Sequence, residues 1–204
     1  MATISGLANL ENLLLTVAPT VIGARVGASR KVVTLLLITG FALLTGLTAL
    51  WEIHLSFTPV PITGQTFAVL LAGATLGLRA GAASQLLYLA MGAVGLPFYA
   101  GGESGWQVLT GPTVGYLVGF VVASAVVGRM AEARADRQVR TAIPAFVVGS
   151  VVIYACGMVG LTLVAGMSVP EAFTLGVVPF LIGDALKATG AGLLLPAAWR
   201  LARR

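Results

Sequence analysis

Two opposite charges, Asp184 and Lys187, stand three positions apart inside the last apolar stretch of the sequence, about residues 172–195. A run of roughly 20 predominantly apolar residues is long enough to cross a bilayer as a helix. Side chains three positions apart share nearly one helix face, so the carboxylate and the ammonium can contact each other or one shared ligand. A charge near the middle of a membrane helix costs about 2.5–3.5 kcal/mol on insertion scales. The pair is therefore either a salt bridge that fixes helix packing or, as we favour, part of a polar binding site within a membrane bundle.

Three glycines, Gly176, Gly183 and Gly190, are spaced by seven and flank the face that carries this pair. A stripe of small residues lets other helices or a ligand approach the backbone closely. The spacing predicts that this face of one continuous helix points into the protein rather than into lipid.

Uncharged polar side chains lie in or beside the other apolar stretches: Thr63, Gln65, Gln85, Tyr88, Tyr99, Thr113 and Tyr116. Such a group at membrane depth must be hydrogen-bonded, because lipid offers it no partner. Bonding between helices explains any one of them at least as well as ligand contact does. Together with Asp184 and Lys187, they describe a pocket that suits a small ligand with an acid tail, a polar head and an apolar middle.

The supply of residues argues against several other kinds of chemistry. Residues 102–105 match the Gly-x-Ser-Gly pattern of intramembrane serine proteases, but Ser104 needs a base, and the one histidine, His54, stands in a distant loop. One histidine, one cysteine (Cys156) and scattered carboxylates leave no credible metal site. The sequence lacks the phosphate-binding Gly-x-x-x-x-Gly-Lys-[Ser/Thr] motif. We therefore expect a protein that is not an enzyme, has no cofactor of its own, and depends on ATP only through a partner.

The composition is that of a polytopic membrane protein. Hydrophobic residues make up 58% of the 204 and charged residues only 9%, against a usual quarter, and the mean hydropathy is +0.99. The net charge of +5 lies in the short connections, so we interpret it as a topology signal and not as a sign of nucleic-acid binding.

Six apolar stretches are predicted to form transmembrane helices, at Val32–Trp51, Gln65–Leu78, Ala80–Leu96, Pro112–Val127, Ile143–Ala165 and Ala172–Leu195. The second and third are short for a bilayer of about 30 Å and are separated by Arg79, so they form either two short spans or a re-entrant hairpin with Arg79 at its tip. Residues 1–31 are expected to be a cytoplasmic or interfacial segment. Residues 32–204 then form one transmembrane domain.

The distribution of cations predicts the orientation of this all-α bundle. With the N-terminus in the cytoplasm and six crossings, eleven of the twelve Lys and Arg residues fall on one side, and Lys187 is the twelfth. Charge bias in short loops sets topology, so both termini are expected to lie inside. The outer loops hold Glu52, His54, Glu103 and Glu171 instead.

Five motifs follow one another along the sequence: Thr58–Thr66 (TPVPITGQT), Leu70–Gly73, Leu87–Gly102, Gly111–Phe120 and Gly183–Lys187. In this order they resemble the motifs of the BioY family, the biotin-specific S components of energy-coupling factor (ECF) transporters. The resemblance implies a six-helix S-component bundle with a biotin site toward the external face, roofed by the loops after the first and third helices.

The resemblance also implies which residues bind biotin. Asp184 and Lys187 match the aspartate and lysine of the family's last helix, without settling which end of biotin each one meets. Gln85 and Tyr88 lie where the family contributes a polar contact, Gln65 follows the proline loop, and Tyr99 lies within the third motif. We include all six as candidate biotin-binding residues. A lysine could neutralise the valerate carboxylate while an aspartate accepts the ureido N–H groups.

The family's mechanism implies partners: a transmembrane coupling subunit and two ATPase subunits, in a bacterial plasma membrane. S components dock through closely spaced small residues of the first helix, for which Ala42 and Gly46 are the candidates here. Three other hypotheses predict different behaviour. A secondary carrier would use Asp184 as a proton or sodium site, a serine hydrolase would depend on Ser104, and a structural subunit would bind no small molecule.

Overall fold

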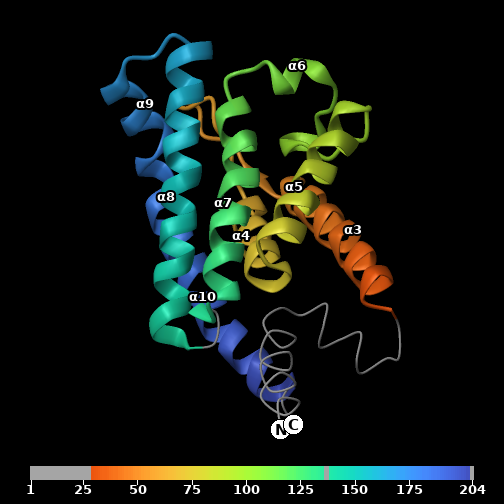
Figure 1. Cartoon of the computed structure of the whole chain (residues 1–204). Coiled ribbons are helices and arrows are strands. Elements are labelled where there is room, and N and C mark those ends of the chain that lie inside the picture. The colour runs from red at the N-terminus through yellow and green to blue at the C-terminus, as the bar shows by residue number, and fades with distance from the viewer. Residues whose placement is uncertain (1–28, 136–137, 203–204) are drawn as a thin grey trace, which may run out of the picture.

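A computed structural model describes residues 29–135 and 138–202, which fold as a bundle of helices with one small two-stranded hairpin (Figure 1). The helices are α3 (Arg30–Ala49), α4 (Gln65–Leu76), α5 (Leu78–Ala93), α6 (Trp106–Leu109), α7 (Val114–Glu132), α8 (Val139–Val164), α9 (Val169–Gly176) and α10 (Leu181–Ala202). Strands β1 (Glu52–Ile53) and β2 (Ile62–Thr63) pair antiparallel, and two 3₁₀ turns, η1 (Ala100–Gly102) and η3 (Val178–Phe180), complete the order.

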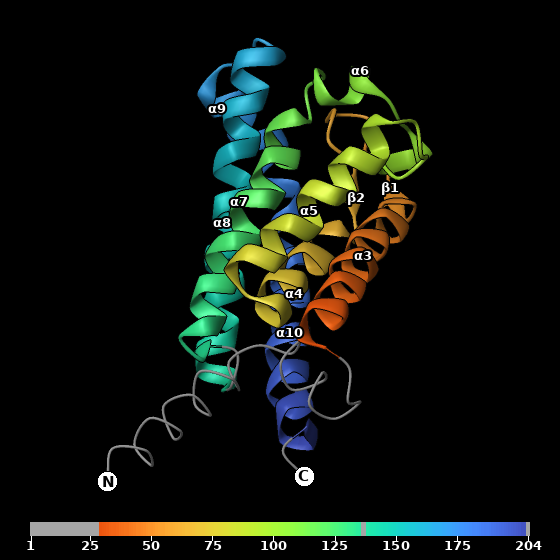
Figure 2. The ribbon, with the colours of Figure 1, turned by 45° about the vertical axis from the view of Figure 1, so that its right-hand side comes forward.

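Helix α7 lies at the centre of the bundle, between α8 on one side and α4 and α5 on the other (Figure 2). The close approach depends on glycine. A Cβ at Gly115 would collide with the backbone of Cys156 and Gly160 on α8, and one at Gly73 with the backbone of Ser124. Backbones packed this closely hold the helices by van der Waals contact, as is usual in membranes, where lipid supplies no hydrophobic drive between helices.

The described residues contain four helical segments long and apolar enough to cross a membrane, at Lys31–Ala49, Val114–Glu132, Val139–Val164 and Val169–Pro196. These agree with four of the six predicted spans, and the protein is a multi-pass membrane protein. Helices α4 and α5 are shorter, so the count of six crossings and the orientation stay predictions. The break between them falls at Gly77, whose φ is 83°, and not at Arg79.

The last predicted span is not one continuous helix, which corrects the sequence prediction. Helix α9 ends at Gly176, η3 follows, and α10 begins at Leu181. Pro179 explains the break, because proline lacks an N–H and disfavours helical geometry at the residue before it. Asp184 consequently lies in the first turn of α10, where the helix dipole favours a negative charge, and not in mid-helix.

The face that carries Asp184 and Lys187 points into the protein as predicted, but the glycine stripe does not mark it. A Cβ at Gly183 or Gly190 would meet no atom within 4 Å, so both face open space. Gly176 does pack inside, against Tyr116 and Leu161, but it precedes the break. The seven-residue spacing therefore does not mark one buried surface.

The two ends of the bundle differ in content (Figure 2). One end holds the start of α3, the turn between α4 and α5, and the end of α10. The other end holds the β hairpin, α6 and α9. The predicted cytoplasmic or interfacial segment falls almost wholly outside the described residues. Helix α3 starts at Arg30, where Ser29 accepts a hydrogen bond from the Val32 amide and caps it.

Candidate functional site

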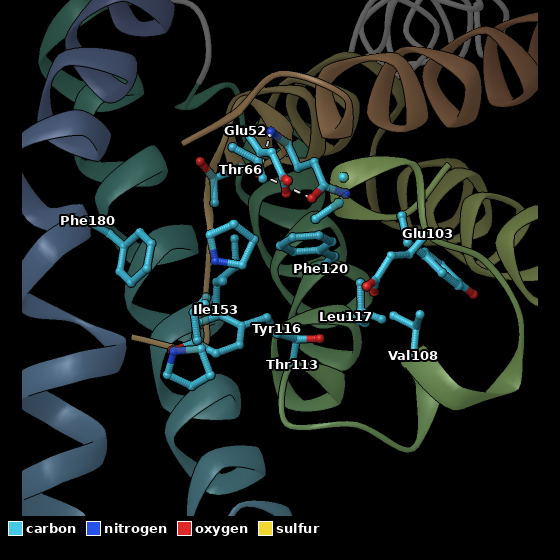
Figure 3. A pocket seen from close by; sticks show the side chains of 18 of the residues that line it. Glu52, Thr66, Glu103, Val108, Thr113, Tyr116, Leu117, Phe120, Ile153 and Phe180 are labelled. Atoms are coloured by element: carbon cyan, nitrogen blue, oxygen red, sulfur yellow. Dashed lines mark hydrogen bonds between the residues drawn. The ribbon is translucent and has the colours of Figure 1, made fainter. Parts of the chain in front are cut away.

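A cavity of about 260 Å³ opens at the end of the bundle that carries the β hairpin (Figure 3). That volume is near the lower limit of small-molecule sites. The wall residues come from the hairpin and its loop, α4, the α5–α6 connection, α6, α7, α8, η3 and the start of α10. They are Glu52, His54, Pro59, Val60, Pro61, Thr63, Gln65, Thr66, Tyr99, Ala100, Gly101, Glu103, Val108, Thr113, Tyr116, Leu117, Phe120, Ile153, Tyr154, Phe180, Asp184 and Lys187.

Asp184 is the most buried charge on this wall, with only 6% of its surface exposed. Its Oδ1 accepts hydrogen bonds from the Thr66 hydroxyl (3.0 Å) and the Lys187 ammonium (2.8 Å), and its Oδ2 accepts one from the Tyr154 hydroxyl (2.6 Å). The donors come from α4, α8 and α10, so three helices meet at this side chain. Hydrogen bonds to a carboxylate are short and strong, and they therefore hold these helices together.

Lys187 uses all three of its N–H donors within the protein. Its Nζ donates to Asp184 Oδ1 at 2.8 Å, to the Thr63 carbonyl at 2.8 Å and to the Thr66 hydroxyl at 2.9 Å. A lysine ammonium has three donors and no acceptor. Of the two arrangements that the spacing allows, the structure shows Asp184 and Lys187 in contact with each other, and the pair forms one hydrogen-bonded cluster with Thr63 and Thr66.

The proline loop between β1 and β2 is fastened to the end of α9. The Thr58 hydroxyl donates to the Leu175 carbonyl (2.8 Å), and the Tyr116 hydroxyl donates to the Gly176 carbonyl (2.7 Å). The last carbonyls of a helix have no partner within the helix, so side-chain donors stabilise them. These two bonds hold the break before α10 and thereby place Asp184 at the cavity.

Gln65 and Tyr99, both predicted from the sequence, also line the cavity. The Gln65 amide accepts a hydrogen bond from the Thr63 hydroxyl (3.1 Å) and donates one to the Tyr88 hydroxyl (2.6 Å). The Tyr99 hydroxyl donates to the Leu89 carbonyl (2.7 Å), and its ring packs edge-on against Tyr88. Burial raises the pKa of Tyr99, so the phenol stays protonated as a donor.

Gln85 and Tyr88 lie behind the cavity wall and not on it. Both are fully buried. Gln85 accepts a hydrogen bond from Thr45 (3.3 Å) and donates one to Ser84 (3.0 Å), while Tyr88 supports Gln65 as described above. The structure therefore brings four of the six candidate residues together around the cavity, and these two only support its wall.

The small residues expected to dock a partner face the protein's own core. Ala42 is fully buried, and a Cβ at Gly46 would lie 2.8 Å from Cγ of Phe98. Both lie inside the bundle in this structure, and their role in docking a partner stays a prediction. The outward face of α3 consists of larger side chains, among them Leu36, Leu43 and Leu47.

The sequence reasoning missed several wall residues, of which Thr66 and Tyr154 are the most important because both donate to Asp184. Tyr154 could have been found, because it is a polar side chain inside the apolar stretch 143–165. Thr66 could have been found too, because it directly follows the proline loop and Gln65. Glu52 and Glu103 are predicted only as charges of the outer loops, yet both line the cavity.

The serine hydrolase hypothesis receives no support from this geometry. Ser104 is not on the cavity wall, and His54 Nδ1 lies 3.2 Å from Glu52 Oε1. Across residues 29–135 and 138–202, no group of three His, Cys, Asp or Glu side chains could hold a metal ion.

Comparison with known proteins gives a consistent result. The sequence profile of the BioY family matches residues 10–204. The chain is 38% identical to the biotin transporter BioY of Rhizobium etli over 160 residues, covering 75% of this chain and 85% of that protein. It is 37% identical to the probable biotin transporter BioY of Pyrococcus horikoshii, covering 78% and 91%.

A solved structure shares the fold. The S component for biotin from an ECF-type ABC transporter matches with a TM-score of 0.77 and 23% sequence identity, covering 86% of this chain and 93% of that one. The matched fold agrees with the predicted S-component-like bundle. The fold, the ordered motifs and the extent of the family match lead to one conclusion: this chain is a member of the BioY family.

Proposed function

We propose that this protein is the biotin-binding subunit of a vitamin uptake system. The observation that carries the proposal is the buried cluster of Asp184, Lys187 and Thr66 at one end of a small cavity, in a chain whose relatives are named biotin transporters. Apolar and aromatic side chains, including Phe120, Ile153 and Phe180, cover the middle of the cavity (Figure 3). This arrangement suits a ligand with one polar head, an apolar body and a flexible tail.

The buried end of the cavity suits the uncharged ureido head of biotin. Lys187 already neutralises Asp184, so a second carboxylate placed there would leave an unpaired buried negative charge. The Asp184 carboxylate has about four acceptor sites, of which three are used by protein donors, so Oδ2 can still receive one ureido N–H group. The valerate carboxylate then stays toward the hydrated mouth, where Glu103 and His54 are exposed.

Transport requires an energy source that this chain does not contain, because it has no phosphate-binding loop. We infer a transmembrane coupling subunit and two ATPase subunits as partners, and a bacterial plasma membrane as the location. If this is right, biotin uptake by cells that express the chain will require active ATPase subunits. Uptake that instead follows a proton or sodium gradient without them would favour a secondary carrier.

Equilibrium binding of biotin to the purified protein in detergent tests the site. Asp184→Asn and Lys187→Ala should each weaken binding by at least about 10-fold, because each leaves the other charge buried without its partner. Glu171→Gln is the matched control, since Glu171 is an exposed outer-side carboxylate that is not on the cavity wall. A folded native chain that binds no biotin would contradict the proposal.

A further inference from the structure

The cavity wall has more negative than positive charge. Three carboxylates line it, those of Glu52, Glu103 and Asp184, against one ammonium, that of Lys187. With His54 counted as neutral, the lining carries a net charge of −2. Among the lining residues, Lys187 is the one cation, so it alone could neutralise an anionic ligand.

Lys187 is not available for that purpose. Its three N–H groups are engaged by Asp184, Thr63 and Thr66 at 2.8 to 2.9 Å, and the Asp184 carboxylate already balances its charge. A ligand carboxylate at Lys187 would have to displace one of these partners and share one cation with Asp184. Two anions close together with one cation repel each other, and burial strengthens the repulsion.

Glu52 adds an unbalanced charge at the mouth. Its Oε1 lies 3.2 Å from Nδ1 of His54, while its Oε2 is buried and has no hydrogen-bond partner among the residues that the structure describes. A buried carboxylate oxygen without a donor is unfavourable, and a donor or a cation brought to it would stabilise it. A second anion brought to the same place would have the opposite effect.

Glu103 lies across the mouth from Glu52, on the connection that follows α5 (Figure 3). Glu103 is exposed, and its side chain has no ion pair to any cation described in the structure. The two carboxylates thus come from the two connections that cover the cavity. Their negative charges repel an anionic group of a ligand at the mouth and attract a cationic one.

We propose that Glu52 and Glu103 make this site selective for the charge of the ligand tail, so that the protein also takes biotin derivatives whose tail is uncharged or cationic, biotin amides above all. The inference rests on the proposed function. Converting the tail carboxylate to an amide removes the repulsion, and ending the tail in an ammonium reverses it. If the charged end of the tail lies about 8 Å from one of these carboxylates, the interaction changes the affinity for the ligand by about 2-fold at the dielectric constant of water and by about 30-fold at a dielectric constant of about 20.

Competition binding to the purified full-length protein tests the inference with three probes. They are biotin, its primary amide, which has nearly the same shape, and biotin joined through an amide to ethylenediamine, which ends in an ammonium. The variants are Glu103→Gln, which changes an exposed side chain, and the double variant Glu52→Gln/Glu103→Gln. Glu171→Gln is the matched control, and thermal unfolding checks that each variant is folded.

In the native protein the amide should bind at least 2-fold tighter than biotin, and the ammonium-ended derivative tightest at low salt. Glu103→Gln should reduce these differences, the double variant should abolish them, and Glu171→Gln should leave them unchanged. Biotin binding more tightly than its amide, or an order of affinity that the double variant does not alter, would overturn the inference while leaving biotin binding intact. Failure of all three probes to bind a folded native chain would overturn the proposed function as well.

Discussion

Tyr154 shows how a residue without charge can control the site. Its hydroxyl donates to Oδ2 of Asp184 at 2.6 Å, which fixes one carboxylate oxygen while Thr66 and Lys187 fix the other. A hydrogen bond to a charged group contributes about 1.5–3 kcal/mol. Without it, Asp184 loses its fixed orientation toward the cavity.

Tyr154→Phe should therefore weaken biotin binding by about 10-fold, with little change in overall folding, because the ring and its packing remain. Isothermal titration calorimetry on the purified variant measures this. Thr189→Val is a suitable control, since within the described part of the chain the exposed Thr189 hydroxyl bonds only to the Ala185 carbonyl of its own helix. Unchanged affinity in Tyr154→Phe would show that Asp184 does not depend on this donor.

Thr58 offers a second residue-scale test, of the contact between the proline loop and α9. Its hydroxyl donates to the Leu175 carbonyl at 2.8 Å and accepts from the Val60 amide at 3.2 Å. Thr58→Val keeps the shape and removes both bonds. Each neutral bond contributes about 1 kcal/mol, so bound biotin should dissociate about 5-fold faster if one bond matters and about 30-fold faster if both do. Stopped-flow or filter-binding dissociation rates measure it, and an unchanged rate would show that the loop is held by other contacts.

At the scale of the elements, the sequence allowed the helices to be predicted better than their breaks. The long stretches around α3, α7 and α8 have the length and apolarity that a bilayer demands, so their existence followed from composition. The break before α10 could have been inferred from Pro179, but the apolar residues on both sides hid it. Hydropathy responds to residue type and not to the missing backbone donor.

The same limit explains the outcome for the site. Asp184 and Lys187 were identifiable because charges within apolar stretches need a reason, and their spacing placed them on one face. Gln85 and Tyr88 lie one turn apart on α5 and share a face too, yet that face packs behind the wall, against Thr45 and Gln65. Which buried polar group reaches a cavity depends on how the helices are rotated against one another, and no local pattern records that rotation.

Glycine positions on α7 and α10 give an element-scale prediction. Gly115→Val should strongly destabilise the protein, because any Cβ there collides with the backbone of Cys156 and Gly160 on α8. Gly190→Ala should instead be tolerated or stabilise α10 by about 0.5–1 kcal/mol, since a Cβ there meets nothing within 4 Å and alanine favours helix. Thermal unfolding in detergent compares the two, and equal effects would contradict the packing described for α7 and α8.

For the bundle as a whole, the lengths of α4 and α5 bear on how many helices cross the membrane. At 1.5 Å per residue, α4 with 12 residues is about 18 Å long and α5 with 16 residues about 24 Å, both less than a hydrocarbon layer of about 30 Å. Length alone therefore fits a re-entrant hairpin as well as two crossings.

A contact with α7 favours two crossings. The Leu78 amide at the start of α5 donates to Oε1 of Glu132, which lies at the end of α7, and Arg129 in the last turn of α7 is exposed. Helix α7 is long and apolar enough to cross the membrane, so its charged end lies at an interface. The α4–α5 turn, bonded to that end, must lie at the same depth, and Arg79 beside it is exposed.

We therefore expect Arg79 to lie at the same membrane surface as the α7–α8 connection. In a Cys156→Ser background, which removes the one native thiol, single cysteines at Arg79, Gln138 and Glu171 can be labelled with a membrane-impermeant thiol reagent. Glu171→Cys should be labelled on intact cells, whereas Arg79→Cys and Gln138→Cys should be labelled only after the cells are permeabilised. If Arg79→Cys were instead labelled from outside, or on neither side, α4 and α5 would form a re-entrant hairpin and the bundle would have four crossings. Labelling that matches Gln138→Cys means that six helices cross, and that the two short helices reach the inner surface because α7 holds their turn there.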